Sequence, residues 1–306
     1  MIDRKQLWSL AEETMRAFAP FYQDAMQDAI QDWGATRDNW FGLSLARGSD
    51  PAPFTVGRFH ALYPYTAREQ FAQALEALAQ LELLERVGED AYRLTGLGRR
   101  AVEGIYAAAH QGLEVIQPLP ADEMAQLNGL LYRLVEATLG APEPEEKWAL
   151  AYSRWTDPGA GASGSVLTDQ HLTDLLRFRD DAHLAAWQPY DVSGHAWEAL
   201  TFIWRGEAGT AEELAEKLPY RGYSAEAYAE TLEDLVDWDW VEKATDGYRV
   251  TEKGDALRRE AEEATDRYFF APWACLDVNE KNQLHDLLTW LKKALHELAE
   301  SDAEAA

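Results

Sequence analysis

The sequence predicts a mainly helical α+β fold in which one structural pattern occurs twice. First, identical residues recur 157 positions apart through most of the chain, as in Trp40 and Trp197, or Leu75 and Leu232. Second, apolar residues follow the helical period in most segments, and each half has a short hairpin pattern. A repeat of this length is a domain. We therefore expect two similar domains related by a pseudo-twofold axis, with long helices at their interface.

The repeats divide the chain of 306 residues into residues 1–140, a linker over 141–165, and residues 166–300. The linker assignment rests on two stretches, Ala141–Pro144 and the Gly-, Ala- and Ser-rich segment Asp157–Ser165. The length is sufficient for two domains that each bury a core.

The first repeat is expected to begin with a helix over residues 7–33, bent near Pro20, and a second helix capped by Thr36. The further elements are predicted as helices over 56–62 and 66–84, strands over 83–86 and 92–95, a long helix after the second strand, and a terminal helix over 121–139.

The second repeat matches this order. Ser193 stands where the first repeat has Thr36, which predicts an N-cap before Trp197. The further elements are predicted as a helix over 224–237, strands over 240–243 and 248–251, a long helix, and a terminal helix over 278–298. The spacing slips to 156 after the hairpin because the first hairpin has one extra residue.

This order of elements is that of a winged helix, and several phrases resemble the MarR family of bacterial regulators. The phrase Arg93-Leu94-Thr95-Gly96-Leu97-Gly98 is similar to the close of the wing in that family, and "VTEKGDALRREAEE" at 250–263 is closer still. Leu119-Pro120-Ala121-Asp122-Glu123, before the terminal helix, is also similar. The resemblance implies two winged-helix domains, palindromic DNA as a partner, and release by a small aromatic or lipophilic ligand. Because family members are homodimers, this chain would be a dimer fused into one polypeptide.

The charge of the chain disfavours DNA. The net charge is −26, with −9 in residues 1–150 and −17 in the remainder. The second recognition-like helix, 224–237, has five carboxylates and no basic residue, so phosphates would repel it. The candidate DNA-binding residues are Arg68, Arg86, Arg93, Arg99, Arg100 and Arg249, and Lys253, Arg258 and Arg259 are further cations near the second wing.

A ligand pocket between the two repeats is a second candidate site. Its predicted lining is Asp181, His183, Trp187, Tyr190, His195, Trp197, Tyr268 and Trp273. Aromatic residues at helical spacing also form ordinary cores, and both interpretations stay open at this point. Asp180, His183 and His195 lack the spacing of a metal motif, so we expect no metal.

Several classes of protein are disfavoured. One cysteine, Cys275, excludes an internal disulfide and a cysteine-rich zinc site. We expect no membrane span, a cytoplasmic location, no cofactor and no enzymatic activity, since no catalytic triad has a recognisable order. Gly159-x-Gly161-x-x-Gly164 is interpreted as flexible linker, because no βαβ unit surrounds it.

Three functions therefore remain as hypotheses. The first is a transcriptional regulator with asymmetric repeats, responsive to a small ligand. The second is an acidic winged-helix protein that binds a protein partner and no longer binds DNA. The third is a ligand-binding or catalytic descendant that uses the aromatic pocket.

Overall fold

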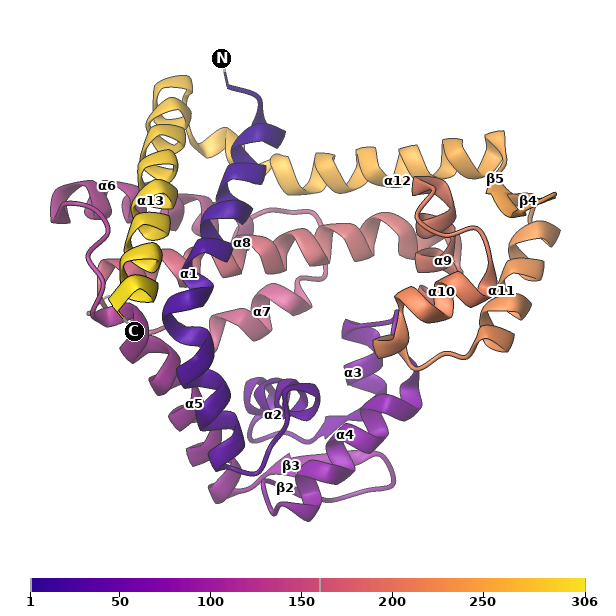
Figure 1. Cartoon of the computed structure of the whole chain (residues 1–306), viewed down its shortest axis with the longest axis horizontal. Coiled ribbons are helices and arrows are strands. Elements are labelled where there is room, and N and C mark those ends of the chain that lie inside the picture. The colour runs from indigo at the N-terminus through magenta and orange to yellow at the C-terminus, as the bar shows by residue number, and fades with distance from the viewer. Residues whose placement is uncertain (1, 160, 306) are drawn as a thin grey trace. The chain divides into compact units, whose positions relative to one another are not determined.

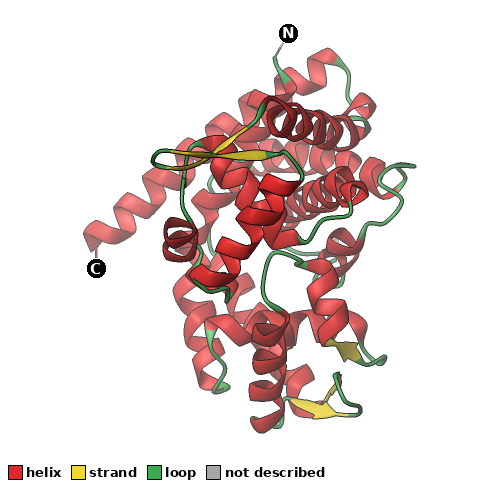
Figure 2. Ribbon diagram, turned by 90° about the vertical axis from the view of Figure 1, so that its right-hand side faces the viewer, coloured by secondary structure: helices red, strands yellow, loops and turns green. Residues whose placement is uncertain are grey.

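The computed structural model describes residues 2–159 and 161–305. Helices make up most of the described chain, and the strands are short (Figure 1, Figure 2). The predicted fold class, mainly helical with small β wings, is confirmed; the sheet of the second wing has the two expected strands, and that of the first wing has a third.

The chain forms two compact units, and each unit takes residues from both halves of the sequence. The helical unit comprises Met1–Arg37, Arg99–Ala182 and Arg267–Ala306. The winged-helix unit comprises Asp38–Gly98 and His183–Asp266. Three long helices contribute residues to both units: α5 (Gly96–Glu114), α8 (Gly164–Trp187) and α12 (Glu252–Phe270).

The core of the helical unit is built mainly from leucine and aromatic side chains. They come from α1 (Arg4–Asp32), α6 (Ala121–Leu139) and α13 (Val278–Ala305), with parts of α5 and α8. Leu134 on α6 and Leu291 on α13 are both fully buried. Full burial of one such side chain stabilises the fold by about 1.5–3 kcal/mol.

Close approach of two helices in this unit requires a glycine. A Cβ atom at Gly112 on α5 would lie 2.1 Å from the backbone oxygen of Phe21 on α1. Any other residue would therefore force the two backbones apart.

The first lobe of the winged-helix unit follows the predicted order. It contains α2 (Arg37–Ser49), β1 (Phe54–Thr55), α3 (Val56–Leu62), α4 (Arg68–Gln80), β2 (Leu84–Arg86) and β3 (Ala91–Leu94). The three strands form an antiparallel sheet in the order β1-β3-β2, with Leu84 paired to Leu94 and Phe54 paired to Tyr92. The sequence did not predict β1, which has only two residues and thus too little pattern to detect.

The second lobe has the same plan. It contains α9 (Gly194–Arg205), α10 (Ala211–Lys217), α11 (Ala225–Asp237), β4 (Val241–Ala244), β5 (Gly247–Val250) and the first part of α12. Its sheet has two antiparallel strands, with Val241 paired to Val250. As predicted, Ser193 caps α9, because its side-chain oxygen accepts a hydrogen bond from the backbone N–H of Ala196.

The Thr-x-x-Gly phrase that ends each wing has a clear structural reason. The Thr95 hydroxyl accepts a hydrogen bond from Gly98 N at 2.9 Å, and Thr251 accepts one from Gly254 N at 3.0 Å. Each threonine thereby caps the helix that follows the wing. A Cβ atom on either glycine would lie 2.1 Å from a backbone oxygen, which explains why the phrase ends in glycine.

The bounds of the elements follow the sequence repeat. α4 and α11 are both 13 residues long and start 157 positions apart, at Arg68 and Ala225. α5 and α12 are both 19 residues long and start 156 positions apart, at Gly96 and Glu252. The shift of one residue lies at the hairpin, as the sequence predicts.

The segment 141–165 is more than a linker, because it contains the helix α7 (Trp148–Arg154). The carboxylate of Asp181 on α8 accepts hydrogen bonds from the backbone N–H groups of Ala149 and Leu150, at 2.8 and 2.9 Å. A contact so distant in sequence explains why local composition did not predict this helix. Every helix in the described ranges 2–159 and 161–305 is too short or too polar to cross a bilayer.

Candidate functional site

Each lobe of the winged-helix unit presents a helix-turn-helix. In the first lobe, α3 and α4 are joined by the turn at residues 63–67. Thr55 caps α3 by accepting a hydrogen bond from Arg58 N at 2.9 Å. Phe59 on α3 and Phe71 on α4 are buried, and their rings stack at 4.0 Å, which fixes the two helices together.

In the second lobe, α10 and α11 are joined by a turn that includes the short helix η2 (Pro219–Arg221). Thr210 caps α10 and Ser224 caps α11. Gly222 lies between them with φ +78°, a left-handed conformation that favours glycine. The second recognition helix is therefore well formed at its N-terminus, the end that contacts bases in helix-turn-helix proteins.

Two of the predicted DNA-binding arginines of the first lobe contact acids of their own lobe. Arg68 Nη2 lies 3.0 Å from Asp90 Oδ2, and Arg86 Nη1 lies 3.6 Å from Glu76 Oε2. Arg86 also donates hydrogen bonds to two carbonyl groups of the wing turn. Binding to a phosphate would have to break or share these contacts.

The remaining candidates differ in their surroundings. Arg249 on β5 pairs with Glu242 on β4 at 2.7 Å, whereas Arg93 on β3 has an exposed side chain. Arg99 and Arg100 belong to the helical unit. Arg93 is thus an exposed candidate for a phosphate contact on the first wing.

The expectation that Arg258 contacts phosphate is wrong. Its side chain is fully buried, with the guanidinium carbon 4.4 Å from the ring centre of Trp197 and 5.2 Å from that of Trp204. Nη2 donates a hydrogen bond to Glu262 at 2.6 Å, while Nε and Nη1 have no hydrogen-bond partner among the residues that the structure describes. Burial lowers the pKa of Arg258. This arginine is part of the core of the second lobe.

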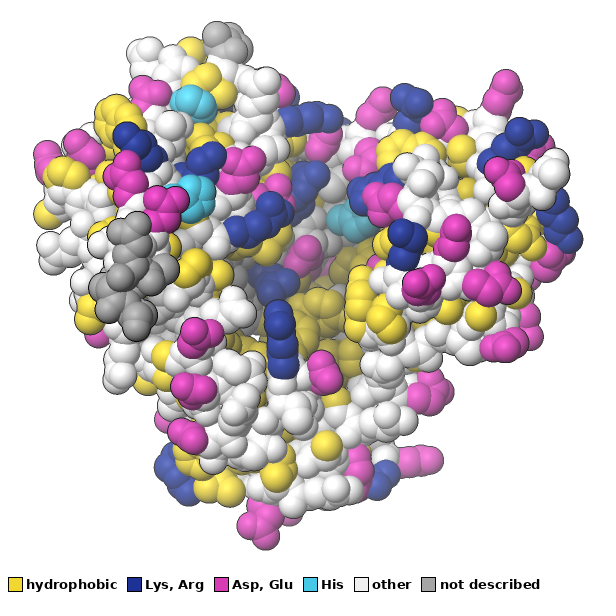
Figure 3. All heavy atoms as spheres, in the orientation of Figure 1, with side chains coloured by type: hydrophobic (Ala, Val, Ile, Leu, Met, Phe, Trp, Pro, Cys, Tyr) yellow, Lys and Arg dark blue, Asp and Glu magenta, His cyan; other side chains and the backbone are white. Residues whose placement is uncertain are grey.

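The acidic face of α11 is exposed, as the sequence predicts. Its carboxylates belong to Glu226, Glu230, Glu233, Asp234 and Asp237, and all five residues are exposed. Glu233 is tied to the wing by hydrogen bonds from Lys243 and Tyr248, both at 2.7 Å. Acidic side chains are scattered widely over the face of the molecule in Figure 3.

The two helix-turn-helix turns contact each other through Arg221. This arginine holds Glu198 of its own lobe in a bidentate ion pair, with Nη2 to Oε1 at 2.6 Å and Nε to Oε2 at 2.9 Å. Its Nη1 donates to Thr66 Oγ1 of the first lobe at 3.2 Å, and its guanidinium lies 5.4 Å from the ring centre of Tyr65. One side chain therefore joins both lobes.

Backbone contacts reinforce this junction. Ala67 N, at the N-terminus of α4, donates a hydrogen bond to Arg221 O at 2.8 Å. A Cβ atom on Gly222 would lie 2.5 Å from the side chain of Gln70, in the first turn of α4. The N-terminus of α4 is thus covered by the loop that leads into α11.

This contact sets the spacing of the two recognition helices. Helix-turn-helix dimers place these helices in successive major grooves, about 34 Å apart. Here the first turn of α4 touches a residue two positions before the cap of α11. With the turns joined, the two helices cannot enter successive grooves together.

The predicted aromatic residues of the second lobe do meet. The Trp197 ring stacks with Trp187 at 5.7 Å and with Tyr190 at 5.6 Å. Trp187 Nε1 donates a hydrogen bond to the hydroxyl of Tyr65 in the first lobe, at 2.8 Å. Trp187 and Trp197 belong to the buried core of the second lobe together with Leu184 and Leu200.

The two predicted histidines lie in the same unit. His195 Nε2 is 2.7 Å from Thr231 Oγ1 on α11, and its ring stacks on Tyr223 at 4.3 Å. Burial lowers the pKa of His195. His183 Nδ1 lies 3.4 Å from the hydroxyl of Thr265.

The other predicted pocket residues, Asp181, Tyr268 and Trp273, belong to the helical unit. Trp273 is buried against Phe269 and Phe270. Asp181 is also buried and caps α7; burial raises its pKa to about 7, and the two backbone hydrogen bonds act in the opposite direction.

Sequence reasoning missed Arg221, Thr66 and Tyr65, the residues that join the lobes. Nothing in their spacing distinguishes them from ordinary turn residues, because each partner lies more than 100 positions away. The one available signal was Pro64-Tyr65, an aromatic residue placed in a tight turn.

Comparison with known proteins agrees with this geometry. The model of a helix-turn-helix family matches residues 161–300, which contain α10, α11 and the second wing. A search of curated proteins and a search of solved structures each gave no match. At a coarse level, residues 161–300 are thus similar to a helix-turn-helix family.

Proposed function

We propose that this chain is a MarR-like transcriptional regulator in which two tandem winged-helix repeats form a pseudo-dimer within one polypeptide. The family match over 161–300 and the equal lengths of α4 and α11 support this proposal. The proposal includes a cytoplasmic location, because a transcriptional regulator needs access to DNA. It also includes the absence of enzymatic activity.

The proposed regulator has its lobes joined in a state that does not read DNA. The observations that carry this point are the hydrogen bond from the Arg221 side chain to Thr66 and the hydrogen bond from Ala67 N to Arg221 O, which together join the turns and cover the N-terminus of α4. Separation of the lobes would free that end of the helix and allow a wider spacing. The acidic α11 makes the two half-sites unequal, so an asymmetric operator fits better than a palindrome.

Fluorescence anisotropy with labelled genomic fragments at low salt tests this proposal. We expect the wild type to bind weakly and Arg221→Ala to bind at least about tenfold more tightly, with a steep salt dependence. Removal of a positive charge cannot by itself raise affinity for DNA, so a gain would report release of the lobes. Arg93→Ala in the Arg221→Ala background should weaken binding and reduce the salt slope by about one.

Arg205→Ala is the matched control, because Arg205 contacts Glu207 in an exposed ion pair of the same lobe. It should leave DNA binding at the wild-type level. If Arg221→Ala binds no genomic fragment at low salt, the proposal of a DNA reader is wrong.

The exposed acids of α11 favour a second candidate, a winged-helix module that binds a basic protein surface. Under this alternative, neither the wild type nor Arg221→Ala binds DNA, and a stoichiometric protein partner copurifies. The triple change Glu226→Gln, Glu230→Gln and Asp234→Asn should release that partner, because it removes three charges without altering the buried face of the helix.

A further inference from the structure

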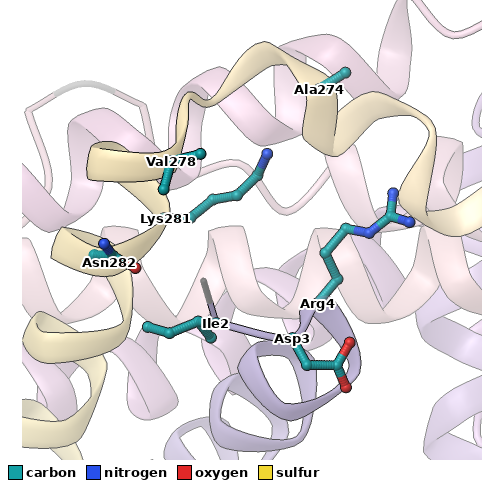
Figure 4. A pocket seen from close by; sticks show the side chains of 7 residues that line it. All are labelled: Ile2, Asp3, Arg4, Ala274, Val278, Lys281 and Asn282. Carbon is teal, nitrogen blue, oxygen red and sulfur yellow. The ribbon is translucent and has the colours of Figure 1, made fainter.

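Two pockets of the helical unit occupy equivalent places in the two halves of the chain. The α1–α13 pocket has a volume of about 430 Å³ and lies where α1 and α13 begin (Figure 4). It is lined by Ile2, Asp3, Arg4, Ala274, Val278, Lys281 and Asn282. The α6–α8 pocket, also about 430 Å³, lies where α6 and α8 begin.

The two linings correspond residue by residue along one wall. Four lining positions of the α6–α8 pocket have counterparts 157 residues later in the α1–α13 pocket: Gln117 and Ala274, Ala121 and Val278, Met124 and Lys281, Ala125 and Asn282. The opposite wall is the start of α8 in one pocket and the start of α1 in the other. The same fold therefore supports two different sets of side chains.

The α6–α8 pocket is mostly apolar, and its buried amide is already used in the structure. Asn128 donates hydrogen bonds to Met124 O and Gly164 O, both at 3.0 Å, and accepts one from Thr168. Glu114 is the one charged residue in the lining of this pocket. The lining of the α1–α13 pocket has one carboxylate, that of Asp3, and two cations, Arg4 and Lys281.

The cations of the α1–α13 pocket come from two different helices. Figure 4 shows Arg4 on α1 and Lys281 on α13 on facing walls, with the carboxylate of Asp3 directed away from the ammonium group. Arg4 lies against the ring of Phe270 at 5.5 Å and is 3.5 Å from Phe270 O. Within residues 2–159 and 161–305, neither cation forms an ion pair with a carboxylate. The equivalent pocket is formed without a cation at either position, so the fold does not require these charges.

We propose that the α1–α13 pocket binds a small organic anion, with its carboxylate between Arg4 and Lys281 and its apolar part against Ile2 and Val278. Two cations on different helices beside one pocket, neither in an ion pair with a carboxylate of the described residues, would attract a small anion to this place. The mixed lining, with a few polar groups beside aliphatic side chains, is typical of small-molecule sites. This site is separate from the recognition helices and does not depend on DNA binding.

Isothermal titration calorimetry with octanoate, octanamide and inorganic phosphate tests the proposal on the full chain. We expect saturable binding of octanoate, and binding at least about tenfold weaker for octanamide, which lacks the charge. Phosphate should also bind at least about tenfold more weakly, because it lacks the apolar part. Equal affinity for octanoate and octanamide, or for octanoate and phosphate, would overturn the assignment.

Residue exchange between the two pockets locates the site. Lys281→Met introduces the residue found at the equivalent position 124, and we expect it to weaken octanoate binding about tenfold or more. Arg4→Gln should have a similar effect, and circular dichroism checks that each variant is folded. Met124→Lys, in the other pocket, should leave the affinity at the original site unchanged. The proposal is wrong if octanoate does not bind up to about 10 mM, or if Lys281→Met binds it as the wild type does.

Discussion

Gln283 on α13 donates a hydrogen bond from Nε2 to Oε1 of Gln126 on α6, at 2.6 Å, and the two residues are counterparts 157 positions apart. A residue that contacts its own counterpart lies beside the twofold axis of an isologous contact. This pair supports the proposed pseudo-twofold relation within the helical unit. The two halves that the axis relates differ in their side chains. For example, Met124 on α6 and Lys281 on α13 occupy equivalent positions.

Loss of Arg221 should destabilise the winged-helix unit. Arg221→Ala leaves the mostly buried carboxylate of Glu198 without its bidentate partner and removes the bond to Thr66. We expect the free energy of unfolding to fall by about 2–3 kcal/mol, measured by urea denaturation. Arg259→Ala breaks an exposed ion pair with Asp255 and should cost less than about 1 kcal/mol. Equal losses for both variants would contradict a buried role for Arg221.

Asp181 and Asp24 occupy equivalent sequence positions but should differ in their effect on stability. Asp181 is buried and caps α7, whereas Asp24 is exposed. Asp181→Ala should lower the free energy of unfolding by about 1–3 kcal/mol, because two backbone N–H groups lose their acceptor. Asp24→Ala should change it by less than about 0.5 kcal/mol. Thermal unfolding of the two variants under identical conditions compares them directly. A similar decrease in Tm for both would show that the hydrogen bonds from α7 to Asp181 contribute little to stability.

Much of the fold could be predicted because local signals and the repeat agree. The bounds of α3, at Val56–Leu62, and of α6, at Ala121–Leu139, match the helices expected from apolar periodicity. Ser193 and Ser224 cap helices where the pattern places a helix start. Because each element occurs in both repeats, each helix or strand is predicted from two different segments of sequence, which reduces errors of assignment.

The contacts between the lobes could not be predicted in the same way. The bond between Trp187 and Tyr65 joins residues 122 positions apart, and no local pattern encodes such a distance. From the sequence, Arg258 is a cation near the second wing that could contact phosphate, and charged residues are rarely buried. The two tryptophans that cover Arg258 lie on α9. Their contact with Arg258 depends on the packing of α9 against α12, which the sequence alone does not show.

Replacement of Arg258 by an apolar residue of similar size should be tolerated. The guanidinium is buried with two N–H groups unsatisfied, so its desolvation offsets much of the benefit of the ion pair with Glu262. Arg258→Met should change the free energy of unfolding by less than about 1 kcal/mol, in either direction. Arg258→Ala should lower it by about 3 kcal/mol, because a cavity is left between Trp197 and Trp204. Urea denaturation compares the two, and a loss with Met as large as that with Ala would show that the charge itself is needed.

Asp169 on α8 should make the stability of the protein depend on pH. Burial raises the pKa of this carboxyl to about 7, and its Oδ1 atom is buried without a hydrogen-bond partner in the described part of the chain. In the unfolded chain the pKa of an aspartate is about 3.9, so between about pH 4 and pH 7 the folded state retains a proton that the unfolded state has lost. The folded state then binds more protons, and stability from this group falls as the pH rises through that window.

Asp169→Asn removes this dependence, because the amide stays neutral and has a similar shape. At pH 4 the variant and the wild type should have similar free energies of unfolding. At pH 8 the variant should be more stable, by about 2 kcal/mol or more, since the wild type must then carry a charge on a carboxyl group whose Oδ1 atom is buried. Urea denaturation of both proteins at the two pH values gives the difference between them, in which all other titrating groups cancel. A difference that is the same at pH 4 and pH 8 would show that the carboxyl of Asp169 titrates in the folded protein as it does in the unfolded chain.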